Sequence, residues 1–198
     1  MTQAYNFTKS LPKLYTLEAY LDREAKAAHK SSYHNGNIIK MAGAKARHNE
    51  IAMNIGSAIK FAAKPLANIY RLYNSDQKIY IAQENTVVYP DAVVVSIVPV
   101  FWEGREDLIT NPLLIVEVLS KSTRQHDKSS KFMLYQNLSS FAEYVLVEQD
   151  ECKVVVWSKT GKNKWEYTIY TDLSDNIVLQ SMENIAISVA DVYENIGF

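Results

Sequence analysis

The stretch "LLIVEVLSKST", residues 113–123, is a run of apolar residues with one carboxylate, Glu117, in its middle. Its apolar part predicts a strand that is covered on both faces of a sheet. Because side chains alternate along a strand, Glu117 shares a face with Leu113, Ile115 and Leu119. An ionised carboxylate there must be paired, bound to a metal or neutralised by a raised pKa. A glutamate near the strand end that reaches solvent or a lysine is the simpler alternative.

A second acidic residue, Asp91, interrupts the apolar run "VVYPDAVVV", residues 87–95. Pro90 cannot donate to a sheet, so we expect an edge, a bulge or a kink at this point. An Asx-type turn after the proline would also explain Asp91. Adjacent strands lie about 4.8 Å apart, so carboxylates on two successive strands can converge on one cation. Carboxylate oxygens suit magnesium or manganese rather than zinc.

Two further polar residues face inward on predicted helices. Lys131 falls within the inward stripe of a helix expected over 127–139, which follows directly from the strand of Glu117. It is either a cation aimed at the same cleft or a lysine whose stem covers the core. His48 extends the apolar stripe of a helix over 45–63, where it could equally be a hydrogen-bonded structural residue.

The remaining elements define the fold class. We expect a helix over 17–30 capped by Thr16, and a closing helical turn over 189–196. The expected strands are 36–43, 68–74, 78–82, 86–96, 113–119, 143–148, a hairpin over 153–171 and a short strand near Ile177. This order predicts an α/β or α+β domain, one unit over residues 1–198, with a mixed central sheet flanked by helices.

Composition sets the broad class of the protein. The 198 residues are 47% hydrophobic and 22% charged, which is ordinary for a globular protein. The single cysteine, Cys152, excludes an intrachain disulfide and suits a reducing cytoplasm. The N-terminal residues carry no signal-peptide pattern, and the longest apolar run is far shorter than the ~20 residues of a membrane helix. We therefore expect a cytoplasmic protein without a membrane partner.

Charge is unevenly distributed along the chain. The net charge is −1, but residues 143–198 carry ten acidic and four basic side chains, so the remainder is positive. Lys121, Arg124 and Lys128 make a local basic patch that could contact phosphates, or that could be a solvated surface. The sequence has no P-loop, no dinucleotide-binding glycine motif and no nucleophile elbow.

These residues resemble a known family. The segments "YPDAVVVS" (89–96), "NPLLIVEVLSKSTRQHDKSSKFMLYQNLSSFAEYVLVEQD" (111–150), "GNIIKMAGAKARHNEIAMNIGSAI" (36–59) and "YNSDQKIYIAQ" (73–83) are similar to the Uma family of restriction-endonuclease-like proteins. The resemblance spans about residues 15–195. It implies the fold of the PD-(D/E)xK nuclease superfamily, a mixed sheet flanked by helices.

The resemblance also implies roles for individual residues. Asp91 and Glu117 would bind Mg²⁺ or Mn²⁺, and Asp76 matches an acidic position that equally fits a turn. The superfamily's lysine follows the acid by two residues, where this chain has Leu119. Lys131, on the following helix, is the matching lysine.

Two functions follow from these expectations. The first is a metal-dependent DNA endonuclease in which Lys131 stabilises negative charge and His48 orients a ligand or the water, while Lys121, Arg124 and Lys128 bind the DNA backbone. The second is a nuclease-fold protein without catalysis that binds nucleic acid or protein, favoured by Leu119 and the net charge of −1. Abundant tyrosine and the resemblance also suggest a homodimer.

Overall fold

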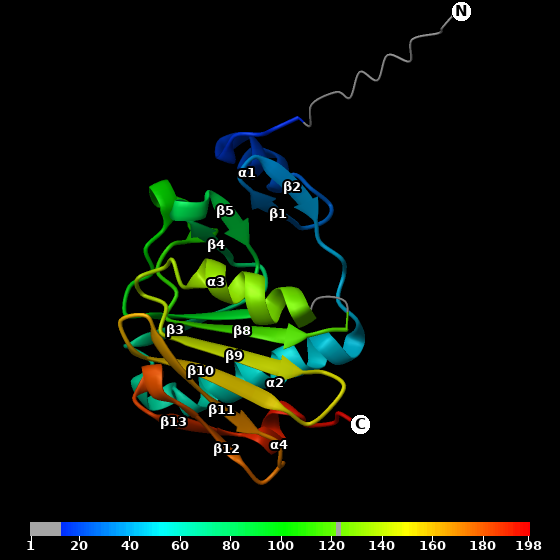
Figure 1. Ribbon diagram of the computed structural model, residues 1–198, viewed down its shortest axis with the longest axis vertical. Coiled ribbons are helices and arrows are strands. Elements are labelled where there is room, and N and C mark those ends of the chain that lie inside the picture. Colours follow the sequence, from blue (N-terminus) through cyan, green and yellow to red (C-terminus); the bar gives the residue numbers. More distant parts are fainter. Residues whose placement is uncertain (1–12, 122–123) are drawn as a thin grey trace, which may run out of the picture.

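The computed structural model describes residues 13–121 and 124–198; residues 1–12, and Ser122 and Thr123 of the quoted motif, lie outside the described residues. A six-stranded sheet forms its centre, in the order β11-β10-β9-β8-β6-β3 (Figure 1). Only β8 and β9 run parallel, so the sheet is mixed, and the expected architecture is confirmed. Its strands are β3 (Tyr70–Asn74), β6 (Ala92–Ser96), β8 (Leu114–Leu119), β9 (Glu143–Glu148), β10 (Val154–Gly161) and β11 (Lys164–Tyr170).

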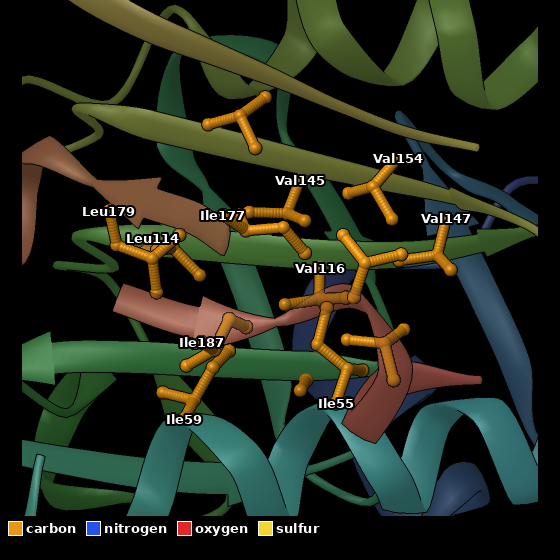
Figure 2. Packing of buried hydrophobic residues seen from close by; sticks show 14 of the residues in the cluster. Ile55, Ile59, Leu114, Val116, Val145, Val147, Val154, Ile177, Leu179 and Ile187 are labelled. Atoms are coloured by element: carbon orange, nitrogen blue, oxygen red, sulfur yellow. The ribbon is translucent and has the colours of Figure 1, made fainter. Parts of the chain in front are cut away.

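Helix α2 (Ala46–Ala62) covers one face of this sheet, within one residue of each expected end. Its buried stripe, Ile51, Ile55 and Ile59, packs against the strand residues whose side chains point to that face. Figure 2 shows Ile55 and Ile59 directed toward Leu114 and Val116 of β8. Strand β8 is buried along its whole length, as its apolar sequence predicts.

A shorter helix covers the opposite face. Its first part, His126–Lys131, is π-helical, and it continues as α3 (Phe132–Tyr135). The helix expected over 127–139 is therefore shorter at its C-terminal end and more loosely wound at its start than its sequence pattern suggests. Tyr135 and Leu138 pack against Ile115 and Leu119, which alternate with the residues under α2.

A second sheet lies above the first in Figure 1, in the order β2-β1-β5-β4-β7. Helix α1 (Leu17–Glu24) packs on it, capped by Thr16 as expected. The helix ends at Glu24 instead of residue 30, because the following residues turn into a strand that we did not expect. The Asn35–Gly36 turn, with positive φ at both residues, closes that hairpin. The strands are β1 (Ser31–His34), β2 (Asn37–Lys40), β4 (Lys78–Ile81), β5 (Thr86–Val88) and β7 (Leu108–Ile109).

The strand expected over 86–96 is in fact two. Residues Thr86–Val88 belong to the upper sheet as β5, whereas Ala92–Ser96 belong to the central sheet as β6. The chain leaves one sheet and enters the other at Pro90 and Asp91, where a break was expected. This crossing places Asp91 at the junction of the two sheets.

The C-terminal part completes the fold. β12 (Asn176–Leu179) and β13 (Ile185–Ser188) form a small hairpin sheet that packs with α4 (Val189–Val192) beside α2. Short 3₁₀ segments are η1 (Lys64–Leu66), η2 (Ala82–Glu84), η3 (Trp102–Gly104) and η5 (Gln180–Met182). Within residues 13–121 and 124–198, no helix combines the length and the apolar character needed to cross a membrane.

Candidate functional site

Asp91 is fixed at the sheet junction by both its backbone and its side chain. Its N–H donates to the carbonyl oxygen of Val116 at 3.1 Å, and its Oδ2 accepts from the N–H of Val118 at 2.7 Å. These two bonds straddle Glu117 on the neighbouring strand β8. The kink after Pro90 therefore holds the Asp91 carboxylate beside the middle of the quoted motif.

His48 reaches the same point from the opposite side of the cleft. It lies in the first turns of α2, and its Nε2 is 2.9 Å from Oδ1 of Asp91. With the side chain only 16% exposed, the imidazole is held between α2 and the sheet. The inward direction expected of His48 is confirmed, and both oxygens of Asp91 have a protein partner.

Glu117 is buried, with 3% of its surface exposed. The hydroxyl of Tyr135 donates to its Oε1 at 2.9 Å, and the ammonium of Lys131 lies 2.8 Å from its Oε2. Burial raises the pKa of Glu117 to about 8, since desolvation outweighs the opposing effect of Lys131, and the charges of Asp91 and Asp127 raise it further. The same burial, with Glu117 beside it, raises the pKa of Tyr135 far above its ordinary value, so Tyr135 is a hydrogen-bond donor.

Lys131 bridges two carboxylates. Besides Glu117 it contacts Oδ1 of Asp127 at 3.1 Å, one turn earlier in the π-helical segment. Burial alone would lower the pKa of Lys131, but the two carboxylates outweigh it and raise the pKa above its ordinary value. The ammonium therefore stays charged, and it enters the site from the helix as the sequence predicts.

These residues line one open cleft of about 1090 Å³ between α2 and the sheet. Asp91, Glu117 and Asp127 against Lys131 leave a formal charge of −2 when all three carboxylates are ionised and His48 is neutral. Among the described residues, no group of three His, Cys, Asp or Glu side chains has the arrangement of a ready metal site. Two carboxylates nevertheless suit Mg²⁺, which keeps several waters and uses one or two protein carboxylates together with substrate phosphates.

The other candidate residues lie outside this cluster. Asp76 is exposed in the turn after β3, where its carboxylate pairs with Lys30 at 2.8 Å. The same turn contains the Asx-type bond from the Asp76 N–H to Oδ1 of Asn74, so the turn interpretation of Asp76 has direct support.

The three residues of the predicted basic patch differ among themselves. Lys121 is exposed. Arg124 and Lys128 each lie 2.7 Å from a carboxylate oxygen of Glu148, which is 1% exposed. Part of their charge is thus used to compensate a buried carboxylate of β9, and their contact with DNA stays a prediction.

Asp127 is a site residue that the inward helical stripe did not select, whereas Tyr135 lies in that stripe but was given no role in the site. The stripe was counted with the ordinary winding of an α-helix, but the π-helical segment is wound more widely and shifts the phase. The spacing 127, 131, 135 is nevertheless visible in the sequence. The four-residue spacing between Asp127 and Lys131 is the signal that could have found Asp127.

Comparison with known proteins supports this picture. The model of the family Uma2, described as "Putative restriction endonuclease", matches residues 17–190. An uncharacterized protein of Synechocystis sp. is 35% identical over 156 residues, covering 79% of this chain and 87% of that protein. A second uncharacterized Synechocystis protein is 29% identical over 98% of this chain and 99% of its own.

A solved structure gives the same fold. The crystal structure of a putative nuclease of the DUF820 group from Anabaena variabilis superposes with a TM-score of 0.72 at 18% identity, over 92% of this chain and 99% of that one. At that identity the likeness shows the fold alone, whereas the family model covers most of the chain. The chain therefore belongs to the Uma2 family of restriction-endonuclease-like proteins.

Proposed function

We propose that this protein is a divalent-metal-dependent endonuclease that hydrolyses phosphodiester bonds in DNA. The observation that carries the proposal is the meeting of Asp91, Glu117 and Lys131 in one cleft, from the residue just before β6, the neighbouring strand β8 and a helix. Membership of a restriction-endonuclease-like family and the nuclease fold support it.

Asp91 and Glu117 are the residues that would hold Mg²⁺ or Mn²⁺. The bound ion would supply Lewis acidity and a lowered pKa for a water molecule. Burial raises the pKa of Glu117 and so disfavours its charged form, and a bound cation would relieve this cost, which supports the proposal. His48 keeps Asp91 oriented through its 2.9 Å hydrogen bond.

Lys131 provides positive charge beside Glu117. Asp127 and Tyr135 restrict where the ammonium and the carboxylate lie, through contacts of 3.1 and 2.9 Å. A preorganised cation of this kind stabilises negative charge that develops on a phosphate during hydrolysis. Leu119 is fully buried in the core below the helix and supplies no charge, so in this proposal Lys131 takes the part of the lysine of the standard motif.

The test is cleavage of plasmid and single-stranded DNA by the purified protein in Mg²⁺ and then in Mn²⁺. Asp91→Asn and Glu117→Gln should each lower the rate about a hundredfold or more, since each removes a charge at the reacting phosphate. Asp172→Asn, at an exposed turn remote from the cleft in sequence, is the matched control and should cut normally. Cleavage that persists in both site variants would exclude this site.

A second candidate is a binding protein without catalysis on the same fold. The ion pair between Lys131 and Glu117 favours it, because the ammonium occupies an oxygen that a metal would use. Calorimetric titration with Mn²⁺ separates the two functions. Heat of binding that disappears in Asp91→Asn supports the endonuclease, whereas no binding by the wild-type protein at neutral pH supports the binding protein.

A further inference from the structure

The cleft extends well beyond the charged cluster, along one face of α2. Its lining includes helix residues in successive turns from His48 to Lys60. Twelve residues of helix at ~1.5 Å each correspond to about 18 Å. At ~3.4 Å per phosphate in a stacked strand, this length accommodates about five nucleotides. The part beyond His48 has no role in the chemistry proposed above.

This extension has a different character from the charged end. Ala52, Met53 and Gly56 of α2 line it, opposite Leu72 and Tyr73 of β3. Met53 lines the cleft and is 70% exposed, so its apolar surface is available to a ligand. Nucleobases stack on apolar and aromatic surfaces of this kind irrespective of their sequence.

Positive charge in the cleft is limited. The ammonium of Lys131 is held by Glu117 and Asp127, and that of Lys30 by Ser75 and Asp76. The exposed Lys60 lies at the far end of the helix face. A duplex-binding surface needs rows of lysine and arginine that follow both phosphate backbones. The cleft instead offers a charged site at one end, an apolar middle and a lysine at the other end.

The apolar lining also favours one strand. In a duplex the bases are paired and stacked on one another, so they are not free to lie against the side chains of the cleft wall. A strand whose bases contact Met53, Leu72 and Tyr73 must therefore be unpaired locally.

We infer that the substrate is bound as single-stranded DNA along α2, with bases against Met53, Leu72 and Tyr73 and a phosphate at Lys60. The inference rests on the proposed function, because it takes the charged end of the cleft as the place where a phosphate reacts. It adds a substrate class and residues with a binding role that the catalytic site does not contain.

The test measures fluorescence anisotropy of a short labelled oligonucleotide, single-stranded or annealed, with the full-length protein in EDTA. Single strands should bind at least about tenfold more tightly than the duplex, and Met53→Glu should weaken that binding about tenfold, the loss expected for one stacked base. Met133→Glu is the matched control, because Met133 is 65% exposed on α3 outside the cleft lining. For Lys60→Glu the matched control is Lys162→Glu, at the β10–β11 turn.

The outcomes distinguish the two proposals. Equal affinity for duplex and single strand, or equal effects of Met53→Glu and Met133→Glu, would overturn the inference. Equal cleavage rates for duplex and single strand in Mn²⁺ would also overturn it, while the endonuclease proposal stands. Single-strand binding that depends on Met53, without cleavage in either metal, would support the binding site and overturn the endonuclease proposal. Thermal melting of each variant shows that the fold is intact.

Discussion

At the scale of single residues, the site is dominated by the buried contact between Lys131 and Glu117. Their side chains are only 14% and 4% exposed, so each charge depends on the other. Removal of one partner of a buried ion pair leaves an uncompensated charge, which costs more than the pair contributes. The same contact therefore affects both how stably the helix packs on the sheet and the charge that the cleft presents.

Above about pH 8, where Glu117 is ionised, Lys131→Met should lower the free energy of unfolding by about 3–5 kcal/mol, the usual cost of breaking a buried pair from one side. The double variant Lys131→Met with Glu117→Gln should be more stable than the sum of the single effects predicts, because it removes the stranded carboxylate. Urea denaturation of the four proteins measures this coupling. Strict additivity would contradict the pairing, and Lys159→Met on an exposed strand end is the control.

The pKa of Glu117 predicts a pH dependence of stability. The pKa is about 8 in the folded, metal-free protein, against 4.5 for an ordinary glutamate. Between these values the folded state holds the proton that the unfolded state has lost, so the free energy of unfolding falls as pH rises and levels off above about pH 8. The difference between wild type and Glu117→Gln isolates this slope in urea titrations from pH 4 to 9. A difference that is flat with pH would show that Glu117 titrates normally.

Single residues were the most predictable part of the site. Asp91, Glu117, Lys131 and His48 were identifiable because a polar group in an apolar stripe needs a partner, and the structure gives each of them one. The partners of these residues were harder to predict from the sequence. Asp127 depends on a π-helical turn, and the pairing of Arg124 and Lys128 with Glu148 links positions far apart in the chain.

At the scale of elements, helix α2 and the central strands followed from their apolar periodicity, because the core they form is large and continuous. The upper sheet was harder to predict. Strand β1 is short and is stabilised by pairing with β2 and β5. The residue pattern within one β-strand does not reveal such pairing. The split between β5 and β6 was visible only as a proline, and sequence alone does not say which sheet each half joins.

The buried residue Glu143 links the central sheet to the C-terminal hairpin through hydrogen bonds. Its carboxylate accepts from the hydroxyls of Ser158 and Ser181 at 2.7 Å each, and from the N–H groups of Gln180 and Ser181. Burial raises the pKa of Glu143, although these donors oppose the shift. The bonds connect β9 and β10 to the 3₁₀ segment between β12 and β13.

Glu143→Ala should therefore loosen the C-terminal hairpin. Several buried donors lose their acceptor at once, at about 1–3 kcal/mol for each group left unpaired. Hydrogen exchange should accelerate in β12 and β13 more than in β8, which lies in the middle of the sheet. Glu166→Ala on exposed β11 is the control. Uniform acceleration over all strands would mean that Glu143 stabilises the whole domain and not this hairpin.

At the scale of the whole molecule, charge and shape act together. The acidic residues concentrate in 143–198, which form β9 to α4, while the rest of the chain is positive. A polyanion should therefore avoid the acidic segment 143–198, and its affinity should depend on salt in proportion to the phosphates that cationic side chains contact. Lys121, Arg124 and Lys128, which follow β8 in the chain, allow this to be tested.

Lys121→Ala should reduce the slope of log affinity against log salt by about 0.7, the value for one phosphate contact on a single strand. Arg124→Ala and Lys128→Ala should change the slope less, because both side chains already compensate Glu148. They should instead lower the melting temperature, since each leaves the Glu148 carboxylate less well paired. Anisotropy titrations at several salt concentrations, with melting curves for each variant, measure both effects. If Arg124→Ala reduced the slope as much as Lys121→Ala without loss of stability, its guanidinium would be directed at phosphate rather than at Glu148, and the basic patch would act as one surface.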